Sequence, residues 1–467
     1  MSEKLGHFVK VKDILKVTNG KLIVGDENFE CKDFTRDTRE IKGGEIYIGL
    51  IGEKINGAIF FEQAFKNGAS GVILQDINIT EEQKEKYKDK IIILVEDTLK
   101  AIQEIAKFKR SLYGENFPVI AITGSVGKTS TKDMIANVIS QKYKTLKTEG
   151  NYNNHIGVPL TILRLKDHEA AVIEMGMNHF NEIRPLTNIA KPTLCAITNI
   201  GTSHIGNLGS RENILKAKLE ILEGNKQKQI VINNDNDLLN KFYNEKNNEI
   251  NIITYGIEEK SDVYATDIIQ KEESSTFICH MNEEEFEVTV PVGGIHFVYN
   301  ALCAASIGNK LGLNSEEIKR GIQSFKLTKK RMDISYLNNG AKVINDSYNA
   351  SFESMKASIC NLSKYDNRKI AVLGDMFELG DYAEELHKKV GAEVAKNKIN
   401  ILICAGENAK YIAMEAEKQG MKKENIYYYE DKNEILNLLN NILTKDDVIL
   451  FKASNGMKFF ELVEKLK

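Results

Sequence analysis

The stretch from Pro118 to Lys132, PVIAITGSVGKTSTK, decides the fold of this 467-residue chain. Its apolar run over 119–123 predicts a buried parallel strand, and the glycine-containing loop that follows leads into a helix. Gly127, Lys128 and Thr129 fall where that helix begins. The order of strand, loop and helix around a GKT sequence predicts a site for the phosphates of a nucleotide.

The chemistry of such a loop depends on backbone N–H groups that close around phosphate oxygens, to which the helix N-terminus adds positive potential. Lys128 offers an ammonium group, and Thr129 can place its hydroxyl on Mg²⁺. Ile122 stands where the general motif has an earlier glycine, so this loop is a shorter variant. We expect a nucleoside triphosphate, held by Gly124, Ser125, Val126, Gly127, Lys128, Thr129 and Ser130.

The composition is that of an ordinary globular protein, with 42% hydrophobic and 28% charged residues. The formal net charge of -3 gives no electrostatic sign of a nucleic acid or membrane partner. The six cysteines lie far apart without a CxxC pair, which predicts reduced core residues. We find no signal-peptide-like segment and no run near the roughly 20 apolar residues of a membrane helix. We therefore expect a cytoplasmic protein, and a monomer.

Three α/β domains are predicted, over 1–97, 98–326 and 327–467. The first is a small α/β domain, in which 59–67 reads as a helix. A helix over 98–113, with Lys109 on its solvent side, is expected to lead into the second domain.

The central domain alternates strands and helices, which predicts a doubly wound ATPase domain of the P-loop type. Its apolar strands are expected at 119–123, 170–175, 193–200 and 229–233. Residues 250–292 change to β-rich alternation, which predicts an antiparallel addition at one sheet edge. A second alternation begins near 330 and predicts a Rossmann-like C-terminal domain, with strands at 343–345, 370–373, 401–404, 427–429 and 448–451.

Polar residues just after strands deserve weight, because ligands of open α/β sheets lie at the carboxyl ends of the strands. Glu174 is an acid in an apolar strand, where burial without a partner is costly, so a metal role is favoured. His204 lies in a turn-rich loop and is by itself ordinary. Lys218 lies in a predicted helix, where a lysine is expected on the surface. Asn151, Asn153 and Asn154 form a polar loop suited either to turns or to a substrate.

Five segments, in order along the chain, resemble motifs of the Mur ligase family, ATP-dependent amide-forming enzymes of bacterial cell-wall synthesis. They are ITGSVGKTSTK, GNYNNHIGVPLT, IEMGMNHFNEI, ITNIGTSHIGNLGSRENILKAKLEI and GGIHFVYNALCAAS. Three more, FTRDTREIKGGEIYIGL, NDSYNAS and VLGDMFELG, are similar to those of the members that add D-alanyl-D-alanine to UDP-N-acetylmuramoyl-tripeptide. The resemblance covers nearly the whole chain.

The resemblance implies roles that spacing does not give. Lys128 would hold the β- and γ-phosphates of ATP, Thr129 and Glu174 would hold one Mg²⁺, and His204 would help to hold a second. Lys218 matches a lysine that relatives carry as a carbamate, an oxygen ligand suited to Mg²⁺. Lys128, Glu174, His204 and Lys218 would thus form the catalytic set.

The remaining implied contacts involve adenine, ATP and the other substrates. Asn300 matches the residue that contacts adenine, and Arg331 and Asp346 match a C-terminal pair that reaches ATP. The implied mechanism proceeds through an acyl phosphate. Substrate contacts are expected at Thr38, Arg39, Asn151, Asn153, Asn154, Ser347, Tyr348 and Asn349.

The chain departs from the family pattern at three places. Ser351 and Phe352 replace the usual Asn-Pro, residues 452–455 replace KGSR with KASN, and residues 56–58 replace Asp-Gly-His with Asn-Gly-Ala. Two alternatives stay open: a ligase with a different acceptor dipeptide or depsipeptide, and a nucleotide-dependent switch or binding protein without ligase activity. The third residue of the tripeptide, meso-diaminopimelate or lysine, is also left open.

Overall fold

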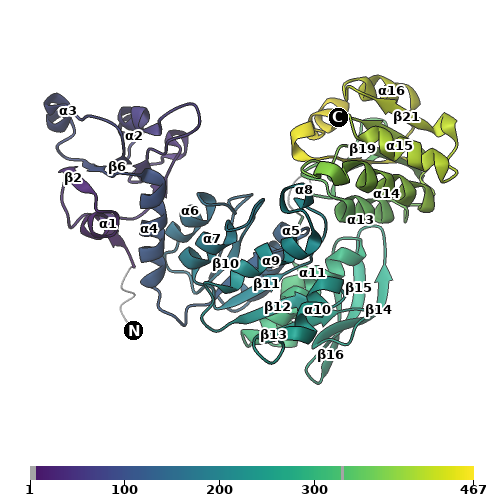
Figure 1. Cartoon of the computed structure of the whole chain (residues 1–467), viewed down its shortest axis with the longest axis horizontal. Coiled ribbons are helices and arrows are strands. Elements are labelled where there is room, and N and C mark those ends of the chain that lie inside the picture. Colours follow the sequence, from purple (N-terminus) through teal and green to yellow (C-terminus); the bar gives the residue numbers. More distant parts are fainter. Residues whose placement is uncertain (1–6, 328–330) are drawn as a thin grey trace.

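The computed structural model describes residues 7–327 and 331–467. Figure 1 shows three α/β bodies that follow one another along the chain, with the central body between the other two. Each body is built on its own main sheet, of five, nine and six strands in chain order. The predicted class of three α/β domains is confirmed, whereas the predicted limits at 97 and 326 stay predictions.

The N-terminal sheet has the strand order β2-β7-β6-β5-β4. Its strands are β2 (Lys21–Val24), β4 (Phe34–Thr35), β5 (Ile46–Ile48), β6 (Gly71–Leu74) and β7 (Ile91–Leu94). A separate antiparallel pair joins β1 (Val9–Lys10) to β3 (Glu30–Cys31). The helices are α1 (Val11–Thr18), α2 (Phe61–Lys66) and α3 (Glu81–Lys86). The helix predicted over 59–67 is therefore shorter, and a 3-10 turn over Gly57–Phe60 precedes it.

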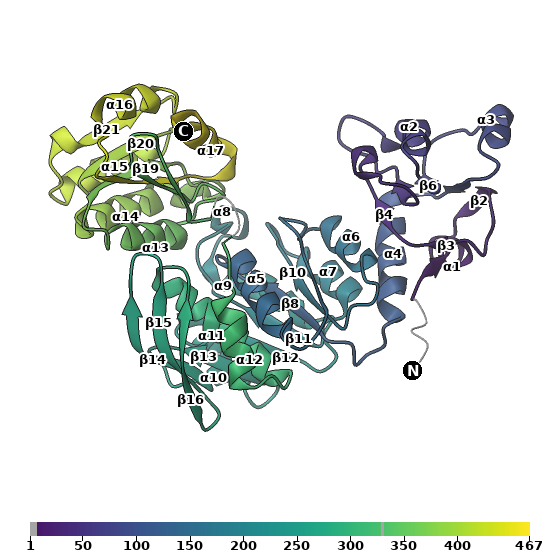
Figure 2. The same ribbon diagram turned by 180° about the vertical axis from the view of Figure 1, so that it is seen from behind.

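Helix α4 (Thr98–Ser111) joins the first two bodies, and its N-terminus is capped by Asp97, which accepts from the N–H groups of Leu99 and Lys100. The predicted solvent exposure of Lys109 is wrong, because this side chain is buried and its Nζ donates to the backbone oxygen of His7. The Nζ also lies 5.8 Å from the ring centre of Phe8, and α1 packs beside α4, as Figure 2 shows from behind. Burial lowers the pKa of Lys109 to about 8.

The central sheet has the order β16-β15-β14-β13-β12-β11-β8-β10-β9. Its parallel strands are β8 (Val119–Thr123), β9 (Thr145–Lys147), β10 (Ala170–Glu174), β11 (Leu194–Ile197), β12 (Gln229–Asn233) and β13 (Asn251–Gly256). Strand β8 is buried along its whole length, as an apolar run between two parallel neighbours predicts.

Three strands, β14 (Val263–Gln270), β15 (Ser275–Met281) and β16 (Glu284–Val290), extend one edge of the sheet. The predicted antiparallel addition is confirmed for the pairings of β14 with β15 and of β15 with β16, whereas β14 meets β13 in parallel. It is wrong for β13, which pairs in parallel with β12 and continues the core sheet.

The helices of the central body include α5 (Lys128–Ile139), which packs against α11 (Ile295–Lys310) and α12 (Ser315–Gln323). The others are α6 (Gly157–Leu163), α7 (Ile183–Ala190), α8 (Ile205–Leu208), α9 (Arg211–Leu219) and α10 (Asp237–Lys246). No helix among residues 7–327 and 331–467 is long and apolar enough to span a bilayer.

The C-terminal sheet has the order β17-β18-β22-β19-β20-β21. Its strands are β17 (Asp333–Tyr336), β18 (Lys342–Asn345), β19 (Arg368–Gly374), β20 (Ile401–Ala405), β21 (Ile426–Tyr429) and β22 (Asp447–Lys452). The edge strand β17, which the sequence did not predict, is antiparallel, and the others are parallel. The helices are α13 (Phe352–Leu362), α14 (Ala383–Lys396), α15 (Ala409–Lys418), α16 (Glu434–Ile442) and α17 (Phe460–Leu466).

All six cysteines are free, as predicted. Five of them are buried and Cys360 is half-buried.

Candidate active site

The loop between β8 and α5 is held in shape by the residues that follow β11. Asn199 accepts a hydrogen bond from the N–H of Val126 and donates to its carbonyl oxygen, both at 3.0 Å. Gly124 has φ +154°, and a Cβ there would lie 1.9 Å from the hydroxyl of Thr198. This position therefore requires glycine, and contacts within the protein fix the shape of the loop.

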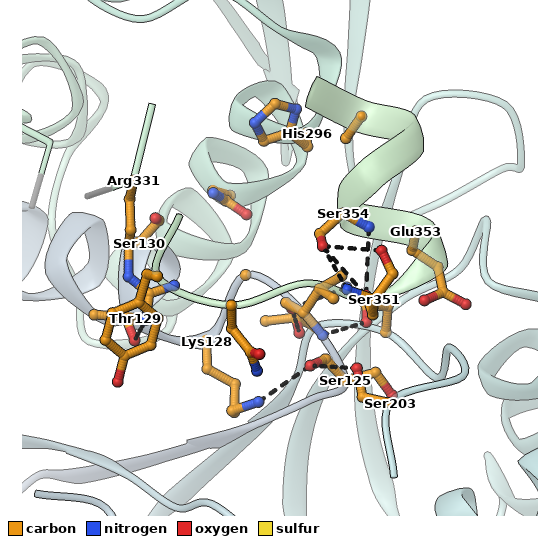
Figure 3. A pocket seen from close by; sticks show the side chains of 18 of the residues that line it. Ser125, Lys128, Thr129, Ser130, Ser203, His296, Arg331, Ser351, Glu353 and Ser354 are labelled. Atoms are coloured by element: carbon orange, nitrogen blue, oxygen red, sulfur yellow. Dashed lines mark hydrogen bonds between the residues drawn. The ribbon is translucent and has the colours of Figure 1, made fainter. Parts of the chain in front are cut away.

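Lys128 lies over this loop at the first position of α5. Its Nζ donates to the carbonyl oxygens of Gly124, at 2.8 Å, and Ser125, at 3.2 Å. Figure 3 shows the side chain extending along the loop toward Ser125. Burial lowers the pKa of Lys128, and the carboxylate of Glu174 opposes that shift.

Glu174 ends β10, one strand away from the loop, and its side chain is buried. Its Oε1 accepts from the amide of Asn153 at 2.8 Å. Its Oε2 is buried and has no hydrogen-bond partner among the described residues. An unpaired carboxylate oxygen in a buried place is costly, so this atom fits a bound cation such as Mg²⁺.

Lys218, in the last turn of α9, is buried, so the surface position that its helix predicted is wrong. Within residues 7–327 and 331–467 its ammonium forms no hydrogen bond or ion pair. Burial, and next the charge of Lys128, lower its pKa well below the ordinary value. This environment therefore disfavours the charged form of the side chain relative to a lysine in water.

His204 precedes the short helix α8 and lines the same pocket as the phosphate loop. Its Nδ1 is hydrogen-bonded to the carboxylate of Glu378, which belongs to the C-terminal body. Across the described part of the chain, no three His, Cys, Asp or Glu side chains gather in a way that could hold a metal ion. The set predicted for Mg²⁺ contains only two residues of these types, Glu174 and His204.

The C-terminal body supplies a second wall to the site. Arg331 donates from Nη2 to the hydroxyl of Thr129 at 2.9 Å, and its guanidinium stacks 4.0 Å from the ring centre of Tyr348. Figure 3 shows Arg331 beside Thr129 at the start of α5. Asp346 accepts from Lys452 at 2.5 Å and from Ser358 at 2.6 Å.

Asn300, on α11, closes the pocket on the side of the central body. It is buried, and its Oδ1 accepts from the hydroxyl of Thr131 at 2.9 Å. A Cβ added at Gly127 would lie 3.5 Å from the same oxygen, so the side chain lies next to the phosphate loop.

These walls enclose a pocket of about 570 Å³ between the central and C-terminal bodies. It brings together fifteen of the predicted site residues: Ser125, Val126, Gly127, Lys128, Thr129, Ser130, Asn153, Asn154, Glu174, His204, Asn300, Arg331, Asp346, Tyr348 and Asn349.

The other predicted residues lie outside the lining of this pocket. Gly124 belongs to the phosphate loop itself, Lys218 is buried in α9, and Asn151 is exposed. Ser347 is buried and donates its hydroxyl hydrogen to Asn345 at 2.6 Å.

Thr38 and Arg39 lie in a separate N-terminal pocket of about 600 Å³, together with Tyr47, Phe60 and the partly exposed Ile55. Arg39 forms a two-pronged pair with Asp37, which lowers the pKa of that carboxyl to about 2.

Three acidic residues in or next to the pocket were not predicted: Glu182 and Glu353, which line it, and Glu378, which contacts a lining residue. Glu353 accepts from the N–H of Thr202 at 2.8 Å and from its hydroxyl at 3.1 Å, and Glu378 contacts His204. Both pairs join residues more than 150 positions apart. The quoted VLGDMFELG segment contains Glu378, but nothing in the sequence indicates its partner.

Comparison with known proteins agrees with the family resemblance of the sequence motifs. Residues 122–308 match the model of the Mur ligase middle domain, and residues 330–455 match that of the Mur ligase glutamate ligase domain. The chain is 38% identical, over 98% of both chains, to the UDP-N-acetylmuramoyl-tripeptide–D-alanyl-D-alanine ligase of Bacillus subtilis.

Two solved structures are similar over most of their length. MurF from Acinetobacter baumannii superposes with a TM-score of 0.86 at 28% identity, over 98% of each chain. MurF ligase from Thermotoga maritima, solved in complex with ADP, gives 0.78 at 27% identity, over 93% of this chain and 97% of that one. With the phosphate loop, the two-domain pocket and a relative matched from end to end, the chain belongs to the Mur ligase family.

Proposed function

We propose that this chain is the ATP-dependent ligase that joins D-alanyl-D-alanine to UDP-N-acetylmuramoyl-tripeptide in peptidoglycan precursor synthesis. The observation that carries the proposal is the single pocket in which the phosphate loop faces Arg331 and Asp346 of the C-terminal body. The full-length similarity to a ligase with this activity supports the choice of substrates. The products are the UDP-N-acetylmuramoyl-pentapeptide, ADP and phosphate.

In this reaction the nucleotide lies along the phosphate loop, with its adenine toward Asn300. The loop N–H groups and the ammonium of Lys128 hold the β- and γ-phosphates. Arg331 adds positive charge from the opposite wall. The terminal carboxylate of the tripeptide attacks the γ-phosphorus, the bond to the β-phosphate oxygen breaks, and ADP leaves an acyl phosphate behind.

Mg²⁺ fits this site because Glu174 presents a buried oxygen without a partner. Thr129 and Glu174 would hold one ion, and His204 would help to hold a second. The ions would neutralise charge on the phosphates. Thr129 and Glu174 contribute hard oxygen atoms, which this cation prefers.

Lys218 would serve as a carbamate. A neutral lysine amine can add CO₂, which forms an N–C bond, releases a proton and leaves a carboxylate-like group. The burial of Lys218 and the lack of an ion pair to its ammonium among the described residues support this chemistry. The product would offer oxygen atoms next to Lys128, where a lysine ammonium would be repelled.

The second half-reaction joins the dipeptide to the activated tripeptide. The free amine of D-alanyl-D-alanine attacks the carbonyl carbon of the acyl phosphate, and phosphate leaves. Tyr348 and Asn349 of the C-terminal wall would contact this dipeptide, and Asn153 and Asn154 the tripeptide. Because water would destroy the acyl phosphate, closure of the bodies would protect it.

The N-terminal pocket would hold the uridine end of the tripeptide substrate, with Thr38 and Arg39 among its contacts. Its size and its mixture of an arginine, a tyrosine and apolar side chains support a nucleoside ligand. We also propose that the enzyme acts as a monomer in the cytoplasm, where ATP is supplied.

The test is the release of phosphate from ATP in the presence of UDP-N-acetylmuramoyl-tripeptide, with and without D-alanyl-D-alanine, with the product mass recorded. We expect release that depends on the dipeptide and a pentapeptide product. Lys128→Ala should remain folded, as judged by circular dichroism, and should lose nearly all turnover.

Each alternative has its own outcome. A depsipeptide or another dipeptide that outcompetes D-alanyl-D-alanine would change the acceptor and keep the chemistry. ATP binding without any ligation product, for every acceptor tried, would overturn the proposal in favour of a nucleotide-dependent switch.

A further inference from the structure

The loop that carries His204 is packed against the C-terminal body by its backbone. The N–H of Gly206 donates to the carbonyl oxygen of Glu378 at 3.0 Å, and the hydroxyl of Tyr382 donates to the carbonyl oxygen of Gly209 at 2.7 Å. A Cβ at Gly206 would lie 2.5 Å from the backbone nitrogen of Gly380. Any side chain at Gly206 would therefore push the two bodies apart.

The two residues at the centre of this contact have unusual backbone conformations. His204 has φ +64° and Glu378 has φ +62°, and both are non-glycine residues in the left-handed region. Such conformations persist where surrounding contacts fix them, and they gather at functional sites. Here each residue helps to fix the other, because the carboxylate of Glu378 is hydrogen-bonded to Nδ1 of His204.

This hydrogen bond decides the form of the imidazole. A carboxylate accepts, so Nδ1 must carry the proton, and the lone pair of the neutral ring is left on Nε2. Nε2 has no hydrogen-bond partner within the described ranges, and His204 lines the phosphate-loop pocket whereas Glu378 does not. The ring therefore lies between the carboxylate and the pocket.

We infer that Glu378 is a positioning residue that holds His204 through Nδ1, so that Nε2 is presented to the phosphate-loop pocket only when the C-terminal body is docked on α8. Figure 1 shows α8 at the junction of these two bodies. A histidine that binds a cation commonly donates its other N–H to a carboxylate, which fixes the tautomer and the ring orientation. In this chain the carboxylate belongs to the C-terminal body. The orientation of His204, which is proposed to help to hold Mg²⁺, therefore depends on the docking of that body. The inference rests on the proposed function.

The test compares Glu378→Ala and Glu378→Gln with the matched control Tyr382→Phe, which removes a neighbouring hydrogen bond between the bodies and leaves Glu378 in place. The first measurement is the imidazole nitrogen chemical shifts of the ligand-free protein, with His204→Gln used to identify the resonance. The second is the affinity for Mn²⁺ in the presence of ADP.

We expect the wild type and Tyr382→Phe to hold the proton of His204 on Nδ1. Glu378→Ala should lose this single tautomer and bind Mn²⁺ about 10–100-fold more weakly, the usual effect of removing such a partner. Glu378→Gln should keep the tautomer and most of the affinity, since its amide oxygen still accepts. A proton on Nε2 in the wild type, or an unchanged Glu378→Ala variant, would overturn the inference.

Neither measurement uses the tripeptide or the dipeptide. Failure of the positioning role can therefore be distinguished from failure of the proposed ligase function. A chain with the expected tautomers and no ligation product would retain the positioning role and lose the proposed reaction. Normal ligation by the wild type, together with an unaffected Glu378→Ala variant, would retain the proposed reaction and reject the positioning role.

Discussion

At the scale of single residues, burial changes the chemistry of Lys218, because it lowers the pKa of the amine well below its ordinary value. Lys218→Ala should lower kcat by at least about 100-fold, because mutation of residues that support metal ligands typically costs 10–100-fold and Lys218 is proposed to be a ligand itself. The reason is that alanine cannot form the proposed carbamate. Short carboxylic acids should restore part of the activity, because they can supply the missing oxygen atoms, and phosphate release measured with added formate or acetate checks this.

The matched control is Lys216→Ala, which removes an exposed lysine two residues away on α9. It should retain turnover and show no response to carboxylic acids. A Lys218→Ala variant that no short acid restores would leave Lys218 without a carbamate role.

Lys109 gives a prediction about stability and pH. Its pKa is about 8 in the folded protein and near 10.5 in an unfolded chain. Between these values the unfolded state binds more protons, so stability rises with pH. The free energy of unfolding of the wild type relative to Lys109→Met should therefore rise by about 3 kcal/mol at most from pH 8 to pH 10.5, and stay level below pH 8.

Urea titrations followed by circular dichroism measure this difference, since the chain has no tryptophan. Lys107→Met, which removes a partly exposed lysine of the same helix, is the control. A wild-type advantage that falls over this pH range would show that the sign is wrong.

At the scale of elements, the N-terminus of α13 explains how the chain tolerates a departure from the family pattern. The Ser351 hydroxyl accepts from the N–H of Ser354, and the Ser354 hydroxyl accepts from the N–H of Ser351 at 2.9 Å (Figure 3). Asparagine caps helices as well as serine does, and proline suits the first helical position, where Phe352 lies. Ser-Phe and the usual Asn-Pro are therefore both suited to begin a helix at this position.

Ser351→Asn should consequently melt within a few degrees of the wild type and keep its turnover. Ser351→Ala loses the side-chain acceptor and should be less stable by about 1 kcal/mol, measured by thermal unfolding. If Ser351→Ala proved as stable as the wild type, the cap would not account for the substitution.

Elements with strong local signals were predictable from the sequence. The strand over Val119–Thr123 was found with its observed ends, because a short apolar run before a glycine loop specifies both of its boundaries. The edge strand β17 was missed, because its half-buried residues carry little apolar signal. Strand β13 was assigned the wrong direction, since alternation indicates a strand but does not give its partner.

The residues of the site also fall into those that the local sequence predicts and those that it does not. The phosphate loop and Glu174 follow from the local sequence. The burial of Lys218 and Lys109 does not, because a helical lysine reads as exposed until another part of the chain covers it. The pairing of Glu378 with His204 depends on how two bodies dock.

At the scale of the whole molecule, the separation of the two pockets raises the question of motion. Figures 1 and 2 show the N-terminal and C-terminal bodies at opposite ends of the central body. One substrate would have its uridine end in the N-terminal pocket and its reacting carboxylate at the phosphate loop. The dipeptide would come from the C-terminal side, and the acyl phosphate must be shielded from water while all three meet.

We therefore expect the radius of gyration, measured by small-angle X-ray scattering, to fall when Mg²⁺, a non-hydrolysable ATP analogue and UDP-N-acetylmuramoyl-tripeptide are added together. Each ligand alone should give less compaction, because only the complete set supplies contacts to all three bodies. Arg331→Ala should compact less than the wild type, since Arg331 is the cation that the C-terminal body places against Thr129. A radius that no combination of ligands changes would mean that the arrangement in Figure 1 already supports catalysis, and water would then have to be excluded by the substrates themselves.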